Sequence, residues 1–132
     1  MIANCLYLAA FPPVLILIHF STPQPKLSVR FFRTAEGREP VREWLKSLPK
    51  GERKVIGDEI RTVQFGWPIG MPVVRKLETG LWEVRVNLPN RIGRVLFTVV
   101  GQQAVLLHGF IKKSDRTPAR DLAVARQRKG QL

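Results

Sequence analysis

The residues best suited to chemistry lie in the second half of the chain, where basic side chains and a histidine recur in three strand-like runs. Two of these runs carry Arg85 and Arg94, and the third carries His108 followed by Lys112 and Lys113. Guanidinium groups hold phosphate oxygens through paired hydrogen bonds, and an imidazole exchanges protons near neutral pH. Metal-free cleavage of RNA needs a base for the 2′-hydroxyl, cations for the pentavalent phosphorane and a proton for the leaving 5′-oxygen. These residues are therefore candidates for binding and cutting a phosphodiester chain.

Other residues of the same region could bind RNA or a ribosome. An aromatic ring gives a base a surface to stack on, and additional cations attract phosphates. The candidates for binding are Lys76, Arg91, Phe110, Lys112 and Arg116. Simpler explanations stay open, because His108 could be a half-buried sheet histidine. Likewise, Arg85 and Arg94 could pair with Glu83 or lie in solvent.

The composition also favours an anionic partner. The chain has 132 residues, with 22 Lys and Arg against 10 Asp and Glu, and its formal net charge is +12. A phosphate backbone would bind to this charge and release its counterions, although an acidic protein or an anionic membrane surface would also be attracted. The single cysteine excludes an internal disulfide and a Cys-based zinc site, which fits a reducing compartment such as the cytoplasm. His19 and His108 alone form no recognisable metal site, and we expect no cofactor.

Residues 1–26 are expected to lie outside the folded domain, which we place at residues 27–132. Residues 5–20 are apolar and uncharged, but this run is shorter than the roughly 20 residues of a transmembrane helix. Pro12 and Pro13 interrupt it, and no basic residue precedes it as in a secretory signal. We therefore expect an upstream extension with a proline-rich linker and no membrane partner. A weak membrane or export segment and a docking element are the alternatives.

The elements that must position the candidate residues follow from the spacing of apolar side chains. Alternation predicts a strand over residues 27–32, and a helical stripe predicts a helix that Pro40 opens and Pro49 stops. A second helix is expected over residues 50–65, and it would form a hairpin with the first. The residues expected to point inward are Val41, Trp44, Leu45 and Leu48 in the first helix, and Val55, Ile56, Ile60 and Val63 in the second.

From residue 73 onward the period changes to two. The predicted strands are residues 73–78, 82–88, 94–100 and 104–112, joined by hairpin turns. A last helix is expected to begin with Thr117 as its N-cap and Pro118 at its first position, and to continue to about Lys129. We write this α+β arrangement as β-α-α-β-β-β-α. It is an antiparallel sheet covered on one face by the helical hairpin, with a C-terminal helix.

Alternation within the last three strands also predicts which side chains share a face. In the last strand, simple alternation places Leu106 with His108 and places Leu107 on the opposite face. The face away from the helical hairpin should then collect the polar residues Glu83, Arg85, Arg94, His108 and Lys112. A register error of one residue would invert part of this assignment.

At these positions the chain resembles the RelE/HigB-like toxins of type II toxin–antitoxin systems, in the phage-derived branch of the RelE/ParE superfamily. The resemblance covers roughly residues 27–130. It rests on Arg75–Leu77, Gly80–Arg85, Arg94–Phe97, Leu106–Lys113 and the closing Lys113–Pro118. It implies a RelE-like fold and a metal-independent endoribonuclease that enters the ribosomal A site and cuts mRNA, which inhibits translation. It also implies a helix-turn-helix antitoxin as inhibitor, through which alone the protein would contact operator DNA.

The resemblance also assigns roles to individual residues. By position, Arg85 and Arg94 match basic residues implicated in phosphate binding and transition-state stabilisation. Lys112 and Lys113 fall near the basic group after the last strand. Glu83 stands where some relatives place a second catalytic lysine, and no tyrosine lies near the C-terminus. His108 could replace the missing acid or base. Two other functions stay open: a gyrase-inhibiting ParE-like toxin, and a non-catalytic nucleic-acid-binding phage-derived protein.

Overall fold

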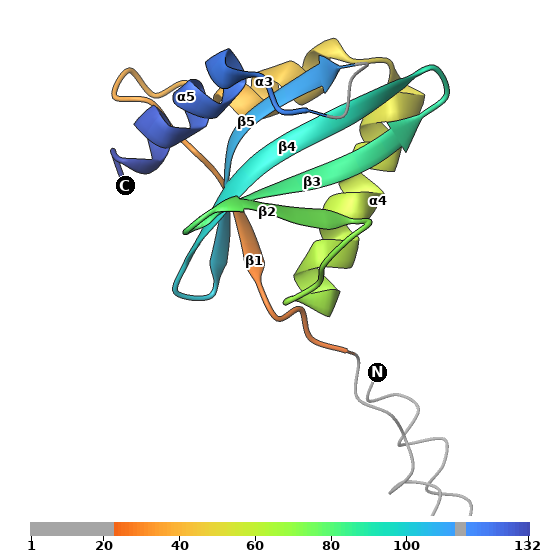
Figure 1. Ribbon diagram of the computed structural model, residues 1–132, viewed down its shortest axis with the longest axis horizontal. Helices are drawn as coiled ribbons and strands as arrows, with labels where there is room; N and C mark the ends of the chain where they lie inside the picture. Colours follow the sequence, from red (N-terminus) through yellow and green to blue (C-terminus); the bar gives the residue numbers. More distant parts are fainter. Residues whose placement is uncertain (1–22, 113–115) are drawn as a thin grey trace, which may run out of the picture.

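The protein has a mixed α+β fold with a five-stranded sheet (Figure 1). The computed structural model describes residues 23–112 and 116–132, so most of the expected N-terminal extension lies outside the described residues. The strands are β1 (Ser28–Phe31), β2 (Val74–Glu78), β3 (Leu81–Leu88), β4 (Arg91–Val100) and β5 (Gln103–Lys112), and the helices are α3 (Pro40–Ser47), α4 (Lys50–Gly66) and α5 (Ala119–Lys129). Within the described part of the chain, no helix has the length and apolar character needed to span a membrane.

The order of strands across the sheet is β1-β5-β4-β3-β2, which corrects two expectations. First, the sheet is not wholly antiparallel, because β1 lies parallel to β5, with Val29 opposite Ala104. Second, four strands follow α4, so the order is β-α-α-β-β-β-β-α. All four strand ranges predicted after residue 73 are present, and only the written order omitted one of them; β2 pairs with β3 and places Val74 opposite Val84. The chain between β1 and β5 passes through both helices and three strands, and so long a connection permits the parallel pairing, which a tight turn could not make.

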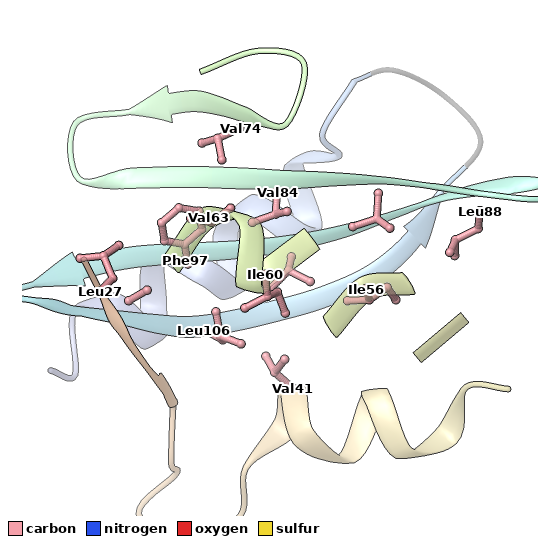
Figure 2. Close-up of a cluster of buried hydrophobic side chains, with 13 residues drawn as sticks. Leu27, Val41, Ile56, Ile60, Val63, Val74, Val84, Leu88, Phe97 and Leu106 are labelled. Carbon is pink, nitrogen blue, oxygen red and sulfur yellow. The ribbon is translucent and has the colours of Figure 1, made fainter. Parts of the chain in front are cut away.

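One face of the sheet forms the larger core with α3 and α4 (Figure 2). Val41 of α3 and Ile60 of α4 are buried against strand residues such as Phe97. The two helices thus bury the apolar stripes that their sequences predicted. Val55 is an exception, because this residue is 38% exposed. It precedes the fully buried Ile56, and one residue rotates the helix by about 100°, so Val55 falls outside the buried stripe.

The opposite face of the sheet carries a second core beneath α5. Its buried members are Phe32, Leu81, Leu96, Val105, Leu107 and Ala125. Figure 1 shows α4 and α5 on opposite sides of the sheet, each over only part of it, so the predicted single cover by a helical hairpin does not describe the molecule. The face that was expected to be polar is therefore partly interior.

A β-bulge in β5 decides which side chains reach this second face. Across the β4–β5 pair, Leu96 lies opposite His108 but Phe97 lies opposite Leu106, so Leu107 is an extra residue. Simple alternation had placed Leu106 on the face of His108. In the structure Leu106 belongs to the larger core, whereas Leu107 belongs to the second core. From His108 onward, β5 presents the faces that the sequence predicted.

Candidate functional site

Four of the candidate residues lie on the sheet face that α5 partly covers: Arg85, Arg94, His108 and Phe110. Arg85 lies opposite Arg94, and Arg94 lies opposite Phe110, so these three residues form one row across β3, β4 and β5. The neighbouring row, from β2 to β5, is Arg75, Glu83, Leu96 and His108. Helix α5 adds Asp121, which contacts His108. The structure therefore brings the two predicted arginines, His108 and Phe110 onto one face.

Glu83 and Arg94 form a buried ion pair at the centre of this face. Both side chains are fully buried, and Nη1 of Arg94 donates to Oε2 of Glu83 at 3.3 Å. The same carboxylate oxygen accepts a hydrogen bond from Oγ1 of Thr117 at 2.6 Å. Thr117 was expected to be the N-cap of α5, but its hydroxyl donates to Glu83 instead. Pro118 occupies the N-cap position. Glu83 thus joins β3, β4 and the segment before α5.

The two predicted arginines occupy different environments. The guanidinium of Arg94 is inside the protein with Glu83, which is the pairing that the sequence left open as an alternative. Arg85 is half-buried, so only Arg85 of the two has part of its side chain in solvent. In this structure Arg94 is placed to hold the sheet face together, and Arg85 is the one of the two that solvent partly reaches.

His108 is held by two neighbours. Its Nε2 lies 2.7 Å from Oδ1 of Asp121, and its side chain is 18% exposed. Its ring stacks on Phe110 with the centroids 5.4 Å apart and an interplanar angle of 24°. His108 is thus an ordered, partly exposed imidazole beside a carboxylate, a pairing that serves either structure or proton transfer.

A groove of about 590 Å³ opens next to this pair, between the start of β4, the end of β5 and the start of α5. Its lining residues are Arg91, Phe110, Ile111, Lys112, Pro118, Arg120 and Asp121. Three cations against one carboxylate make it basic. Glu52 of α4 pairs with Arg91 at 2.5 Å, and the side-chain hydrogen bond raises the pKa of Arg91 above its ordinary value. Arg91 therefore stays charged at the rim of the groove.

Three of the predicted binding residues, Arg91, Phe110 and Lys112, line this groove, and two others do not. Lys76 is exposed on the edge strand β2 opposite Trp82, with β3 and β4 between it and β5. Arg116 is exposed before α5 and is not part of the groove lining. Lys113, predicted to be catalytic, lies outside the described residues. Residues 23–112 and 116–132 contain no group of three or more His, Cys, Asp or Glu side chains that could hold a metal ion.

Sequence reasoning missed Asp121 and Arg120, which bring α5 into the site. Both lie in the terminal helix that the sequence predicts, for which it predicts no role in the site. One signal was available: Asp121 is the only acidic residue in residues 116–132, a segment that has five Lys and Arg residues. A lone carboxylate on so basic a helix indicates a specific partner, and the structure identifies that partner as His108.

The chain was compared with curated proteins and with models of protein families. No curated protein matches the chain. A family model described as Phage derived protein Gp49-like (DUF891) matches residues 43–130, which includes every described residue of the groove and of the polar sheet face. Because this match covers more than half of the chain, the protein belongs to the phage-derived Gp49-like family.

Proposed function

We propose that this protein is the toxin of a type II toxin–antitoxin system and that it acts as a ribosome-dependent mRNA endoribonuclease. The observation that carries the proposal is the basic groove beside His108, in which three cations and an aromatic ring adjoin an imidazole. The Gp49-like family is RelE-like and toxin-like, which supports a toxin. The formal net charge of +12 favours a phosphate-rich partner.

In the proposed reaction, the message lies in the groove with one base on Phe110 and its phosphates near Lys112 and Arg120. The 2′-hydroxyl loses its proton to a base and its oxygen attacks the adjacent phosphorus. The bond from phosphorus to the 5′-oxygen then breaks, and that oxygen takes up a proton. The products are a 2′,3′-cyclic phosphate and a 5′-hydroxyl end. The reaction thus needs proton transfer at two oxygens and positive charge at the phosphorane.

The residues divide these tasks. His108 is the acid or base, and Arg85 supplies positive charge from the sheet face that His108 shares. Arg94 has a supporting role in this proposal: its buried ion pair with Glu83 holds β3 and β4 in place. This replaces the direct phosphate contact that the sequence predicted for Arg94. Lys76 and Arg116, outside the groove, would contact ribosomal RNA around the A site.

The proposal also names partners. A cognate helix-turn-helix antitoxin would inhibit the protein, and contact with operator DNA would come only through that antitoxin. The protein would act in the cytoplasm, where it meets translating ribosomes. It needs no cofactor for the proton transfers and charge stabilisation described above.

Inducible expression of the full chain, with primer extension on a translated reporter message, tests the proposal. We expect growth arrest together with discrete cuts in the message. His108→Ala should abolish both, and Lys112→Gln/Arg120→Gln should reduce both because it removes two groove cations. Lys54→Gln is the matched control, since Lys54 is an exposed cation of α4 whose side chain pairs with Asp58. It should leave arrest and cuts unchanged.

The alternative functions give different results in the same experiment. Arrest without cuts would contradict a nuclease and favour a gyrase-inhibiting toxin. Nucleic-acid binding without arrest would favour a non-catalytic phage-derived protein. Arg94→Ala is a poor test of catalysis, because it would leave Glu83 buried without its ion-pair partner and so disturb the fold.

A further inference from the structure

We propose that Asp121 is a positioning residue that makes His108 the general base of the reaction. Asp121 would hold one ring nitrogen of His108 and leave the other for the ribose 2′-hydroxyl. This inference rests on the proposed function and deepens it, because the sequence left open which residue is the base. Its starting point is the contact between Nε2 of His108 and Oδ1 of Asp121.

The chemistry of the two groups determines the tautomer. An ionised carboxylate can only accept hydrogen bonds, so at 2.7 Å from Oδ1 the Nε2 of His108 must carry the hydrogen. In the neutral imidazole the other nitrogen, Nδ1, then has a free lone pair. A nitrogen with a free lone pair can take a proton, whereas an N–H cannot. Asp121 thereby favours the tautomer in which Nδ1 has no hydrogen and can act as a base.

The surroundings also hold the ring in one orientation. Stacking on Phe110 restricts the plane of the imidazole, and the hydrogen bond to Asp121 fixes its direction within that plane. Asp121 is itself only 6% exposed. Its helix is tied down on both sides, by Thr117 to Glu83 before it and by Nη1 of Arg128 to the carbonyl of Leu107 after it. An imidazole held in this way needs little rearrangement to meet a reacting group.

The step balances without a further reactant. Nδ1 takes the proton of the 2′-hydroxyl while the bond from the 2′-oxygen to phosphorus forms. The bond from phosphorus to the 5′-oxygen breaks, and water supplies the proton that this oxygen requires. The imidazolium that results carries its new positive charge beside the Asp121 carboxylate, which stabilises it as a buried aspartate does in the catalytic triads of hydrolases. Both Phe110 and Asp121 line the groove, so His108 adjoins the expected path of the RNA.

Nitrogen NMR of the purified full chain tests the tautomer directly. The chain has only two histidines, His19 and His108, so a His108→Gln variant assigns the signals. We expect the neutral ring of His108 to carry its hydrogen on Nε2, as read from nitrogen shifts at a pH above which they no longer change. In Asp121→Asn the side-chain amide can donate to Nε2, so the hydrogen should move toward Nδ1. A wild-type protein with its hydrogen on Nδ1 would overturn the inference, whether or not any variant folds.

Cleavage kinetics test the role of the pair. With saturating ribosomes, Asp121→Asn should slow single-turnover cleavage by about 100-fold, the lower range for a lost acid or base, while ribosome affinity stays unchanged. Asp58→Asn, the same substitution at an exposed position of α4, should cleave at the wild-type rate. Cleavage by Asp121→Asn at the wild-type rate would overturn the inference and leave the proposed function standing. If Asp121→Asn lowered ribosome affinity and melting temperature together with cleavage, this would overturn the inference too, because Asp121 would then serve to hold α5 in place. No cleavage by the wild type would instead overturn the proposed function.

Discussion

Single residues show how strongly burial divides side chains of the same type. Arg85 and Arg94 lie opposite one another on neighbouring strands, yet Arg94 is fully buried and Arg85 is half-buried. The difference comes from Glu83, which supplies a buried counter-charge for Arg94 and accepts a second hydrogen bond from Thr117. The carboxylate of Glu83 therefore gives Arg94 a buried partner, and of the two candidate phosphate ligands only Arg85 keeps contact with solvent.

Arg94→Ala should destabilise the protein by about 3 to 5 kcal/mol, because it leaves the carboxylate of Glu83 buried without its ion-pair partner. Urea unfolding of the purified protein, compared with the wild type, measures this loss. Arg85→Ala is the comparison within the same row, and we expect a smaller loss because Arg85 is only half-buried. A double variant, Glu83→Leu/Arg94→Met, should recover much of the stability, since it replaces the pair with apolar side chains. Unfolding of Arg94→Ala at the wild-type urea concentration would contradict a stabilising pair.

Among the elements, β5 does the most to connect the fold with the site. It pairs with both β1 and β4, and its bulge at Leu107 directs His108 toward α5. Between His108 and Phe110 stands Gly109, over which the indole ring of Trp44 packs from α3. A β-carbon at Gly109 would overlap that ring, so α3 can approach β5 only where a side chain is absent.

Gly109→Ala should therefore destabilise the protein by about 1 to 3 kcal/mol, the usual cost of overpacking a core. Gly57→Ala is the matched control with the opposite expected sign. Gly57 lies inside α4 with open space around its β position, so alanine should stabilise the helix by about 0.5 to 1 kcal/mol. Thermal unfolding of both variants measures the difference. Equal stability of Gly109→Ala and the wild type would mean that α3 can move away from β5 without cost.

Helix α5 is held to the edge of the sheet by an ion pair with a definite pH dependence. Arg126 contacts both oxygens of Glu78 on β2, and these hydrogen bonds lower the pKa of Glu78. A lowered carboxyl pKa in the folded state stabilises the protein above the ordinary pKa, and this contribution is lost as the pH falls through the folded value. Melting temperatures of the wild type and Glu78→Gln should differ near pH 7 and converge in acid. Glu36→Gln, at an exposed loop position, is the control, and a difference that persists in acid would contradict this account.

The elements also show how far sequence patterns reach. The period of apolar residues was enough to locate both helices of the hairpin and the strands of the meander, because each such element has one face that must be buried. It was not enough to place Leu106 and Leu107, since a bulge adds a residue without any change in composition. It also could not show that α5 buries Ala125 against Leu96 and Leu107, because this helix is mostly polar. The partnership of His108 with Asp121 depends on that unpredicted contact.

At the scale of the whole molecule, charge couples stability to the proposed activity. The chain has a net charge of +12, so its Lys and Arg side chains repel one another. Ion pairs such as Glu52–Arg91 offset that repulsion only in part. Added salt weakens repulsion between surface charges as well as their attraction to phosphates. The free protein should then melt at a higher temperature in moderate salt, while its affinity for RNA falls. The same charges would favour RNA binding and disfavour the free fold.

The groove cations allow this coupling to be measured. Lys112→Gln/Arg120→Gln should reduce the salt dependence of RNA or ribosome affinity by about two in the slope of log K against log salt, one for each lost phosphate contact. It should leave the melting temperature of the free protein unchanged or raised, because it removes two like charges from one groove. Lys54→Gln/Arg61→Gln, two exposed cations of α4, should change the slope much less. An equal slope change in both double variants would mean that affinity follows net charge alone, and that the groove beside His108 does not select the site of binding.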